Sequence, residues 1–350
     1  MSRLLRNLLI GLAVIALAAL GAVGWYVSAL SPTPASPESY IRFFKRTEIA
    51  DVLAKLKDRG VVKNPSAMGL YFSLHHGEHT IPIGTFRIRG GETAQDILDS
   101  FREPVRQMVR MPETNWARRD AHLLEKHQVT SAADYMKIVD DPPPELAKLV
   151  DFPLPEGSLE GYLYPDTYDF PPLLGAMDVV KRRLTAFNEK VYLPLGKPKK
   201  LKQMVIIASL IELEAGNDRD RALISGVIYN RLNKGMPLQL DAAILYGLGK
   251  WRRLHYSDYK NVKSPYNLYL HKGLPPGPIC SPSLKSMEAA INPAKHHYLY
   301  YIAFPKGGTV YAATYAEHLK NVKKRDAELK AAAERKAILK GLLSANPAKP

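Results

Sequence analysis

A run of 23 residues without a charged side chain, from Leu8 to Leu30, constrains this chain more than any other feature. About twenty apolar residues are enough to cross the hydrocarbon core of a bilayer as a helix. Trp25 and Tyr26 lie near the end of the run, and aromatic rings favour the membrane interface. We therefore expect residues 1–30 to form a short basic tip and a single transmembrane anchor.

The alternative for this segment is a cleaved signal peptide, whose apolar core is usually about 7–15 residues long. The observed run is longer, which favours a retained anchor. Arg3 and Arg6 precede it, but Arg42, Lys45 and Arg46 follow it, so charge alone does not fix the orientation. A long C-terminal domain is translocated largely regardless of its charge. We expect one crossing of the cytoplasmic (inner) membrane, with the N-terminus inside and the large C-terminal part of the chain in the periplasm or another extracytoplasmic space.

Charge and cysteine content narrow the possible partners. The 350 residues hold 49 Lys and Arg against 34 Asp and Glu, a formal charge of +15, which indicates an anionic partner or surface. A location outside the cytoplasm argues against nucleic acid and leaves anionic lipid or an acidic cell-wall polymer. The single cysteine, Cys280, excludes an intramolecular disulfide framework and a multi-cysteine zinc site.

Periodicity and turn residues predict an α+β protein. Three prolines and three serines in residues 31–39 indicate a linker, which we place at 31–44. A helical pattern over 49–56, a strand at 84–88, a capping box at Thr93 and a strand at 105–111 follow. We predict a small α+β domain at 45–112, a mainly helical domain at 113–335 and a basic tail at 336–350. The helices predicted in the second of these domains span 115–127, 131–139 and 201–215.

Glu212 and Glu214 end the most apolar of the predicted soluble helices. Two positions along a helix are about 200° apart, so the two carboxylates cannot share a face. Glu214 shares its stripe with Ile207, Leu210 and Ile211. Apolar walls favour a neutral carboxyl and raise its pKa, as a general acid near neutral pH requires. The alternative is an ordinary solvated helix end at Ala215 and Gly216.

Two further segments carry polar groups that suit a carbohydrate. Asn230 and Arg231, near the end of the next predicted helix, can hold a carboxylate or a sugar hydroxyl, or can equally connect helices. Residues 264–279 contain four prolines, two glycines and two tyrosines, which indicates a rigid loop bearing aromatic side chains. A loop of this length is either functional or purely structural.

Other candidate groups fit a catalytic site less well. His75, His76, Glu78 and His79 lack the helical spacing of zinc motifs, so we do not expect a metal there. Cys280 has no histidine at an informative spacing. Glu160 and Asp166 lie in a proline-containing stretch, where an aspartate typically caps a turn.

Several of these segments together resemble the YceG-like family of membrane-bound endolytic murein transglycosylases. The strongest matches are ASLIELEAG at 208–216, SGVIYNRLNKGMPLQLD at 225–241 and SPYNLYLHKGLPPGPICSP at 264–282. Weaker matches are GTFRIRGGETAQDIL at 84–98 and EGYLYPDTYDF at 160–170. The resemblance implies a LysM-like domain in contact with glycan, followed by a lysozyme-like catalytic domain.

The resemblance also implies roles for individual residues. The second glutamate of the first motif, Glu214, matches the catalytic position. The positions that match substrate-binding parts of the family pattern are Arg221, Asn230, Arg231, Gln239, Asp241, Tyr266, Asn267, Tyr269, Gly273, Leu274 and Pro275. The chain departs from the pattern at Leu213, Asp220, Leu240, Ala242 and Ala243, where the family has a lysine, a glutamate, two threonines and a proline.

The implied reaction cleaves the β-1,4 bond between N-acetylmuramic acid and N-acetylglucosamine inside nascent glycan strands and leaves 1,6-anhydro ends, which terminates strand elongation. One titrating carboxyl is sufficient for this chemistry, and neither a metal nor a cofactor is required. The implied partners are peptidoglycan strands, the membrane and, as candidates, peptidoglycan synthases. Two alternatives remain: a non-catalytic wall-binding scaffold, and a muramidase-type hydrolase with Asp241 as the second carboxylate.

Overall fold

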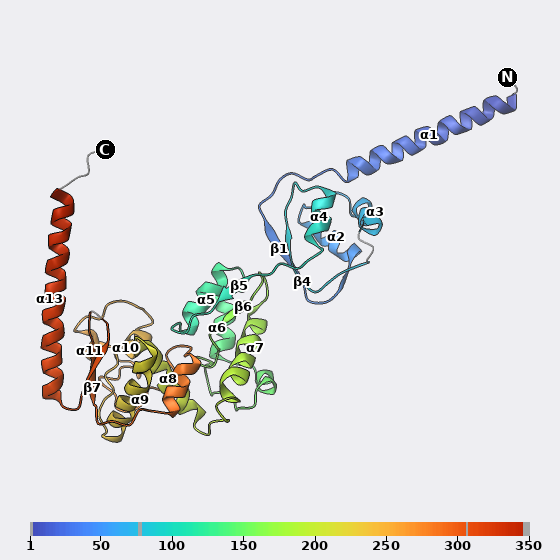
Figure 1. Cartoon of the computed structure of the whole chain (residues 1–350). Coiled ribbons are helices and arrows are strands. Elements are labelled where there is room, and N and C mark those ends of the chain that lie inside the picture. The colour runs from blue at the N-terminus through green and yellow to red at the C-terminus, as the bar shows by residue number, and fades with distance from the viewer. Residues whose placement is uncertain (1–2, 76–78, 306, 346–350) are drawn as a thin grey trace. The chain divides into compact units, whose positions relative to one another are not determined.

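The N-terminal apolar segment forms a single long helix in the computed structural model, which describes residues 3–75, 79–305 and 307–345 (Figure 1). This helix, α1 (Arg3–Ala29), has no buried residue. Among the described residues, it is the one helix that is long and apolar enough to cross a membrane. It starts before the apolar run because arginine and leucine are both good helix formers.

The chain folds as two compact units, the first formed by residues 1–109, 124–130 and 168–175. In this unit β1 (Ser39–Phe43) pairs antiparallel with β4 (Gly84–Ile88), so that Ile41 lies opposite Phe86. The other elements of the unit up to residue 100 are β2 (Thr47–Glu48), α2 (Ile49–Asp58), α3 (Pro65–His75), β3 (Thr80–Ile81) and α4 (Ala94–Ser100).

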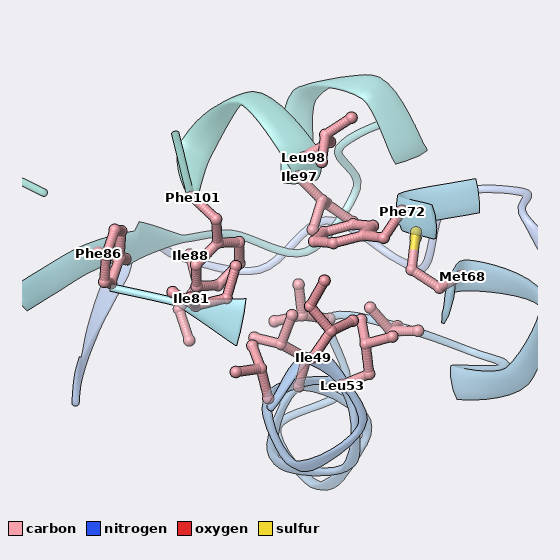
Figure 2. Packing of buried hydrophobic residues seen from close by; sticks show 14 of the residues in the cluster. Ile49, Leu53, Met68, Phe72, Ile81, Phe86, Ile88, Ile97, Leu98 and Phe101 are labelled. Atoms are coloured by element: carbon pink, nitrogen blue, oxygen red, sulfur yellow. The ribbon is translucent and has the colours of Figure 1, made fainter. Parts of the chain in front are cut away.

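The core of the first unit lies between the sheet and these helices. Figure 2 shows Phe86 and Phe101 beside Ile88, with Phe72 and Met68 over the residues of α2. The rings of Phe86 and Phe101 are 5.2 Å apart, in a tilted arrangement that aromatic pairs favour. All residues of this cluster belong to the first unit, and they hold the small α+β body together.

The first unit confirms most of its predicted elements and corrects two. The helix near 49–56, the strand at 84–88 and the capping box are present, with Thr93 Oγ1 accepting from Asp96 N at 3.2 Å. The linker prediction is wrong over 39–43, because this segment is strand β1. Its alternate side chains Ile41 and Phe43 are buried. The helix α3 was not predicted, although its first residue, Pro65, is of a type that suits the first helical turn.

The second unit, formed by residues 110–123, 131–167 and 176–350, is mainly helical. Its helices run through α5 (Ala117–Lys126), α6 (Ala132–Asp140), a 3₁₀ turn (Pro144–Leu149), α7 (Ala176–Phe187), a π-helical turn (Asn188–Tyr192), α8 (Leu201–Glu214), α9 (Asp218–Asn233), α10 (Asp241–Leu248), α11 (Asp258–Asn261), α12 (Leu284–Ile291) and α13 (Tyr315–Ala345). β7 (Tyr300–Ala303) and β8 (Thr309–Ala312) form a hairpin.

Helix α8 is the central element of the second unit. Every residue from Met204 to Glu212 is buried, and α8 packs against α9, α10 and α12. The predicted helices at 115–127, 131–139 and 201–215 are confirmed. The strand predicted at 105–111 is shorter, since only β5 (Met108–Arg110) pairs with β6 (Thr167–Asp169). Helix α13 continues through the predicted boundary at 335, so the basic tail is helical as far as residue 345.

Candidate active site

The two glutamates of α8 lie in different environments, as their helical spacing predicts. Glu212 is buried, with 7% of its surface exposed. Glu214, the last residue of the helix, is half-buried. Since α8 stops at Glu214 and Ala215 is extended, the second carboxyl lies at the edge of the packed core. Glu214 is therefore the one of the two that solvent or a ligand can reach.

The carboxyl of Glu214 has the properties of a general acid near neutral pH. The pKa of Glu214 is raised to about 7, mainly by burial and in smaller part by the nearby charge of Asp241. The hydroxyl of Tyr301 donates to Glu214 Oε2 at 3.0 Å, and both this bond and the charge of Arg231 lower the pKa. A carboxyl balanced in this way is protonated in a large share of molecules at pH 7.

Tyr301 comes from the β7–β8 hairpin, which α9 holds in place. Tyr301 lies opposite Tyr311 in the hairpin register. The carboxylate of Asp220, in the first turn of α9, accepts from Thr309 Oγ1 at 2.7 Å and from Tyr311 OH at 2.9 Å. Asp220 thus fixes the strand next to Tyr301, although the sequence suggested only that it replaces a family glutamate. Tyr301 itself was missed, since an apolar strand gives no sign of a neighbour 87 residues away.

Asp241 is held beside the site by two tyrosines. Tyr269 OH donates to Asp241 Oδ1 at 2.7 Å, and Tyr259 OH donates to Oδ2 at 3.3 Å. The rings of these tyrosines are 4.7 Å apart. Asp241 is exposed and close enough to Glu214 to affect its pKa. A second carboxylate is therefore present near Glu214, and a water-activating role for it has to be tested by experiment.

The Asn230–Arg231 pair connects elements of the second unit. Asn230 Nδ2 donates to the carbonyls of His296 and Tyr298, at 2.8 and 3.0 Å. Arg231 donates to the carbonyls of Leu299 at 2.6 Å and Leu238 at 2.7 Å. These contacts agree with the alternative that the pair connects structural elements. The charge of Arg231 also acts on Glu214, whose pKa it lowers.

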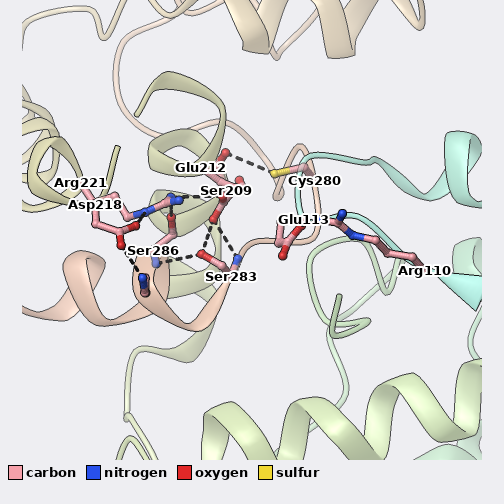
Figure 3. A network of polar contacts seen from close by, with 10 residues as sticks. Arg110, Glu113, Ser209, Glu212, Asp218, Arg221, Cys280, Ser283 and Ser286 are labelled. Carbon is pink, nitrogen blue, oxygen red and sulfur yellow. Dashed lines mark hydrogen bonds and ion pairs between the residues drawn. The ribbon is translucent and has the colours of Figure 1, made fainter. Parts of the chain in front are cut away.

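Arg221 lies against Glu212 instead of Glu214 (Figure 3). Its Nη1 is 3.1 Å from Glu212 Oε1 and 2.6 Å from Ser286 Oγ. Glu212 Oε2 accepts from both the backbone N–H and the hydroxyl of Ser283, at 2.9 and 2.6 Å. These contacts fasten α8 and α9 to the start of α12. The contact of Arg221 with substrate stays a prediction, and in the structure its guanidinium pairs with Glu212.

The loop 264–279 is fixed by its own buried groups. Asn267 is fully buried, and its Nδ2 donates to the carbonyls of Tyr259 at 3.2 Å and Val262 at 2.9 Å. The N–H of Ile279 donates to Ser209 Oγ on α8 at 3.1 Å. Asn267 is thus a residue that shapes the loop, and the loop presents Tyr269 to Asp241.

The remaining predicted binding residues lie around this loop in different settings. Gln239 has a positive φ of 52°, and its N–H donates to the carbonyl of Leu268 at 3.1 Å. Gly273 has a φ of 88°, which favours glycine. Pro275 is buried, and the half-buried Leu274 lines a separate cavity of about 790 Å³. Tyr266 lines another cavity, of which Glu160 is also a lining residue.

The histidine-rich segment, Cys280 and Asp166, which we did not expect to be catalytic, have structural contacts or lie outside the described residues. His75 ends α3, with its Nδ1 2.8 Å from the carbonyl of Tyr71, whereas His76 and Glu78 lie outside the described residues. No group of three potential metal ligands is found in the described part of the chain. Cys280 is buried, and burial raises the pKa of its thiol. Asp166 forms an ion pair with Lys190.

Comparison with known proteins gives consistent matches. The sequence model of a family described as YceG-like matches residues 42–324. A Bacillus subtilis protein named endolytic murein transglycosylase is 31% identical over 78% of this chain and 81% of its own length. A Streptococcus pneumoniae protein of the same name is 31% identical over 87% of this chain, which spans 63% of that relative. The 2.6 Å crystal structure of a YceG-like protein from Listeria monocytogenes aligns with a TM-score of 0.54 and 29% identity, covering 81% of this chain and 99% of that one.

Proposed function

This chain belongs to the YceG-like family, and we propose that it is an endolytic murein transglycosylase, the activity for which its relatives are named. It is then a lyase that cuts peptidoglycan glycan strands internally. The observation that carries the mechanism is Glu214: a half-buried carboxyl with a pKa raised to about 7, held by Tyr301 and beside Arg231.

The first step is proton transfer from Glu214 to the glycosidic oxygen between N-acetylmuramic acid and N-acetylglucosamine. As the C1–O bond breaks, the muramyl C1 gains oxocarbenium character, and the leaving N-acetylglucosamine departs as an alcohol. Glu214 becomes a carboxylate in this step. The hydroxyl of Tyr301 and the charge of Arg231 both favour that charged form, so they stabilise the product of the proton transfer.

The second step closes a ring within the bound sugar. The Glu214 carboxylate takes the proton of the muramyl C6 hydroxyl, and the C6 oxygen bonds to C1 to give a 1,6-anhydro ring. Glu214 regains its proton, so the cycle is balanced without water and without a second acid. An intramolecular hydroxyl in the right geometry also has a far higher effective concentration than an external nucleophile.

A muramidase-type hydrolase is the second candidate, because Asp241 is near Glu214. Both of its carboxylate oxygens already accept from tyrosine hydroxyls, which orient Asp241 and engage the atoms that would activate a water. This favours a supporting role for Asp241. A non-catalytic scaffold is the third candidate, and it would need no carboxyl with a raised pKa at a helix end.

We further propose that α1 anchors the protein once in the cytoplasmic membrane, with its N-terminus inside and the second unit outside. The support is an unburied apolar helix of 27 residues. In the first unit, two helices between an antiparallel strand pair support a LysM-like, glycan-binding role. External protease on intact spheroplasts should digest the second unit, and protection of that unit would reverse the orientation.

The direct test is digestion of purified glycan strands by the full-length protein in detergent, followed by mass spectrometry. Internal fragments ending in 1,6-anhydromuramic acid are expected, and they should cap and so terminate strands. Intact strands after prolonged digestion would indicate a scaffold. Release of single disaccharides from strand ends would contradict the endolytic mode.

A further inference from the structure

A second cavity in the second unit has walls suited to a carbohydrate. We call it the Trp116 pocket. It encloses about 330 Å³, within the range of small-ligand sites. Its lining includes Trp116, Glu160, Tyr246, Gly247, Ser264 and Tyr266. Tyr266 is the one predicted substrate-binding residue that lines this cavity, and the proposed chemistry at Glu214 does not use it.

Aromatic rings make up much of the pocket. Trp116 meets Tyr246 edge-on at 5.5 Å, and Tyr246 lies 4.7 Å from Tyr266. Trp251, 49% exposed, meets Trp116 edge-on at 6.1 Å at the side of the pocket. The chain has three tryptophans, and the third, Trp25, is in α1. One tryptophan of the second unit therefore lines the pocket and the other lies against it, and aromatic rings provide the flat apolar contact that sugar rings favour.

The polar groups of the pocket are suited to hydroxyl groups and not to a strong charge. Glu160 is 5% exposed and accepts from the N–H of Ala117, the first residue of α5, at 2.9 Å. Tyr246 OH lies 3.4 Å from the same carboxyl. Ser264 and Tyr266 add hydroxyls. Arg118 and Asp140, both exposed, give one charge of each sign at the rim.

Two segments lead from the candidate active site to this pocket. Helix α10 begins at Asp241 and carries Tyr246 five residues later, a rise of about 7.5 Å along the helix axis. The loop carries Tyr269, which binds Asp241, and Tyr266 three residues earlier. Gly247 allows these segments to pack closely, because a Cβ there would lie 2.5 Å from Ser264 Oγ. Helix α10 and the loop therefore contribute residues both to the surroundings of Glu214 and to the pocket.

We infer that the Trp116 pocket binds an uncharged N-acetylated sugar ring of the glycan strand, at a site distinct from the bond that is cut. The inference rests on the proposed function for the identity of the polymer. It adds a distal subsite that Trp116, Tyr246 and Tyr266 line, and the exposed ring of Trp251, which meets Trp116 edge-on, extends this aromatic surface outside the pocket. Such a subsite requires a long strand and therefore favours internal cutting over removal of end groups.

The test measures binding without turnover. Full-length Glu214→Gln protein in detergent is titrated with the hexamer of N-acetylglucosamine, a neutral probe without peptide, by isothermal titration calorimetry. Intrinsic fluorescence is recorded in parallel, because Trp116 lines the pocket and Trp251 lies against Trp116. We expect saturable binding with a change in tryptophan emission, and weaker binding of the dimer than of the hexamer.

Two variants test the location, each made in the Glu214→Gln protein. Trp251→Ala removes an exposed ring and leaves the core intact, and Trp116→Phe keeps an aromatic ring in the buried position. Each should weaken hexamer binding roughly fivefold or more. Tyr256→Ala is the matched control, since Tyr256 is an aromatic residue 79% exposed in the same unit and does not line the pocket. It should bind the hexamer like the parent.

The outcomes separate this inference from the proposed function. Equal affinities for Trp251→Ala, Trp116→Phe and the control would overturn the pocket, even if the wild-type protein cuts strands normally. Binding of peptide-bearing fragments only would also overturn it. Conversely, loss of hexamer binding in both pocket variants would support the pocket even if the wild-type protein proved to be a hydrolase.

Discussion

Two glutamates of the second unit, Glu214 and Glu160, share several properties and differ in the ones that matter for catalysis. Burial raises the pKa of Glu214 to about 7 and that of Glu160 to about 8. Each carboxyl lies near a tyrosine hydroxyl, Tyr301 at 3.0 Å and Tyr246 at 3.4 Å. A raised pKa alone would therefore nominate both as general acids.

The difference lies in access and in the fixed partners. Glu160 is 5% exposed, and its two oxygens lie 3.2 and 2.9 Å from the N–H of Ala117. Glu214 is half-buried at a helix end, and its carboxyl accepts from the Tyr301 hydroxyl, which can reorient as the proton leaves. A carboxyl that must give up and regain a proton needs such freedom. Glu160 is better suited to shaping a binding pocket.

The largest expected effect separates the two neighbouring glutamates of α8. Glu214→Gln keeps the shape of the side chain and removes the transferable proton, so turnover of glycan strands should fall by about a hundredfold or more. Glu212→Gln is the matched control and should cost less, because Glu212 binds Ser283 and Arg221 away from the acid. Near-normal turnover in Glu214→Gln, with loss in Glu212→Gln, would reverse the assignment.

The second prediction concerns stability and Glu160. A carboxyl whose folded pKa is about 8, against an ordinary 4.5, binds its proton more tightly in the folded state. The stability it contributes is fully present below about pH 4.5 and is lost as pH rises through about 8. Glu160→Gln should therefore lose less thermal stability than wild type between pH 5 and pH 8. Glu156→Gln, which changes an exposed glutamate, is the control; identical slopes in all three proteins would refute the buried, protonated Glu160.

The smallest expected effect tests the partner of Glu214. The Tyr301 hydroxyl lowers the pKa of Glu214, so its removal in Tyr301→Phe should raise that pKa further. Because the acid must be protonated, activity should fall with rising pH above about 7 in wild type, and at a higher pH in the variant. The pH dependence of kcat/KM measures this shift, with Tyr315→Phe as an exposed control. A shift toward lower pH would contradict the assigned role of Tyr301.

The sequence predicted the elements whose patterns are local. The apolar pattern of residues 201–215 identified α8, and its helical spacing separated Glu212 from Glu214. The capping box at Thr93 was visible because its two partners are three residues apart. The strand β1 was hidden by the prolines and serines before it, since pairing with β4 depends on residues more than forty positions away.

The candidate site was predictable only where one short motif carried it. Glu214 could be nominated from its motif, but Tyr301 is 87 residues away and its role arises only when the hairpin packs beside α8. Arg221 was expected at the substrate, yet its guanidinium pairs with Glu212 after α9 folds back. The Trp116 pocket joins residues from α5, α10 and the loop, which no linear pattern brings together.

The central claim is that the nucleophile belongs to the substrate and is not water, and digestion in isotopically heavy water tests it most directly. Purified glycan strands are digested by the full-length protein in water enriched in ¹⁸O, and the new muramic ends are analysed by mass spectrometry. We predict 1,6-anhydro ends that are lighter than the reducing sugar by one water and carry no ¹⁸O. Incorporation of ¹⁸O at the new muramic terminus would show that water attacked C1, with Asp241 as its candidate base, and would contradict the transglycosylase mechanism.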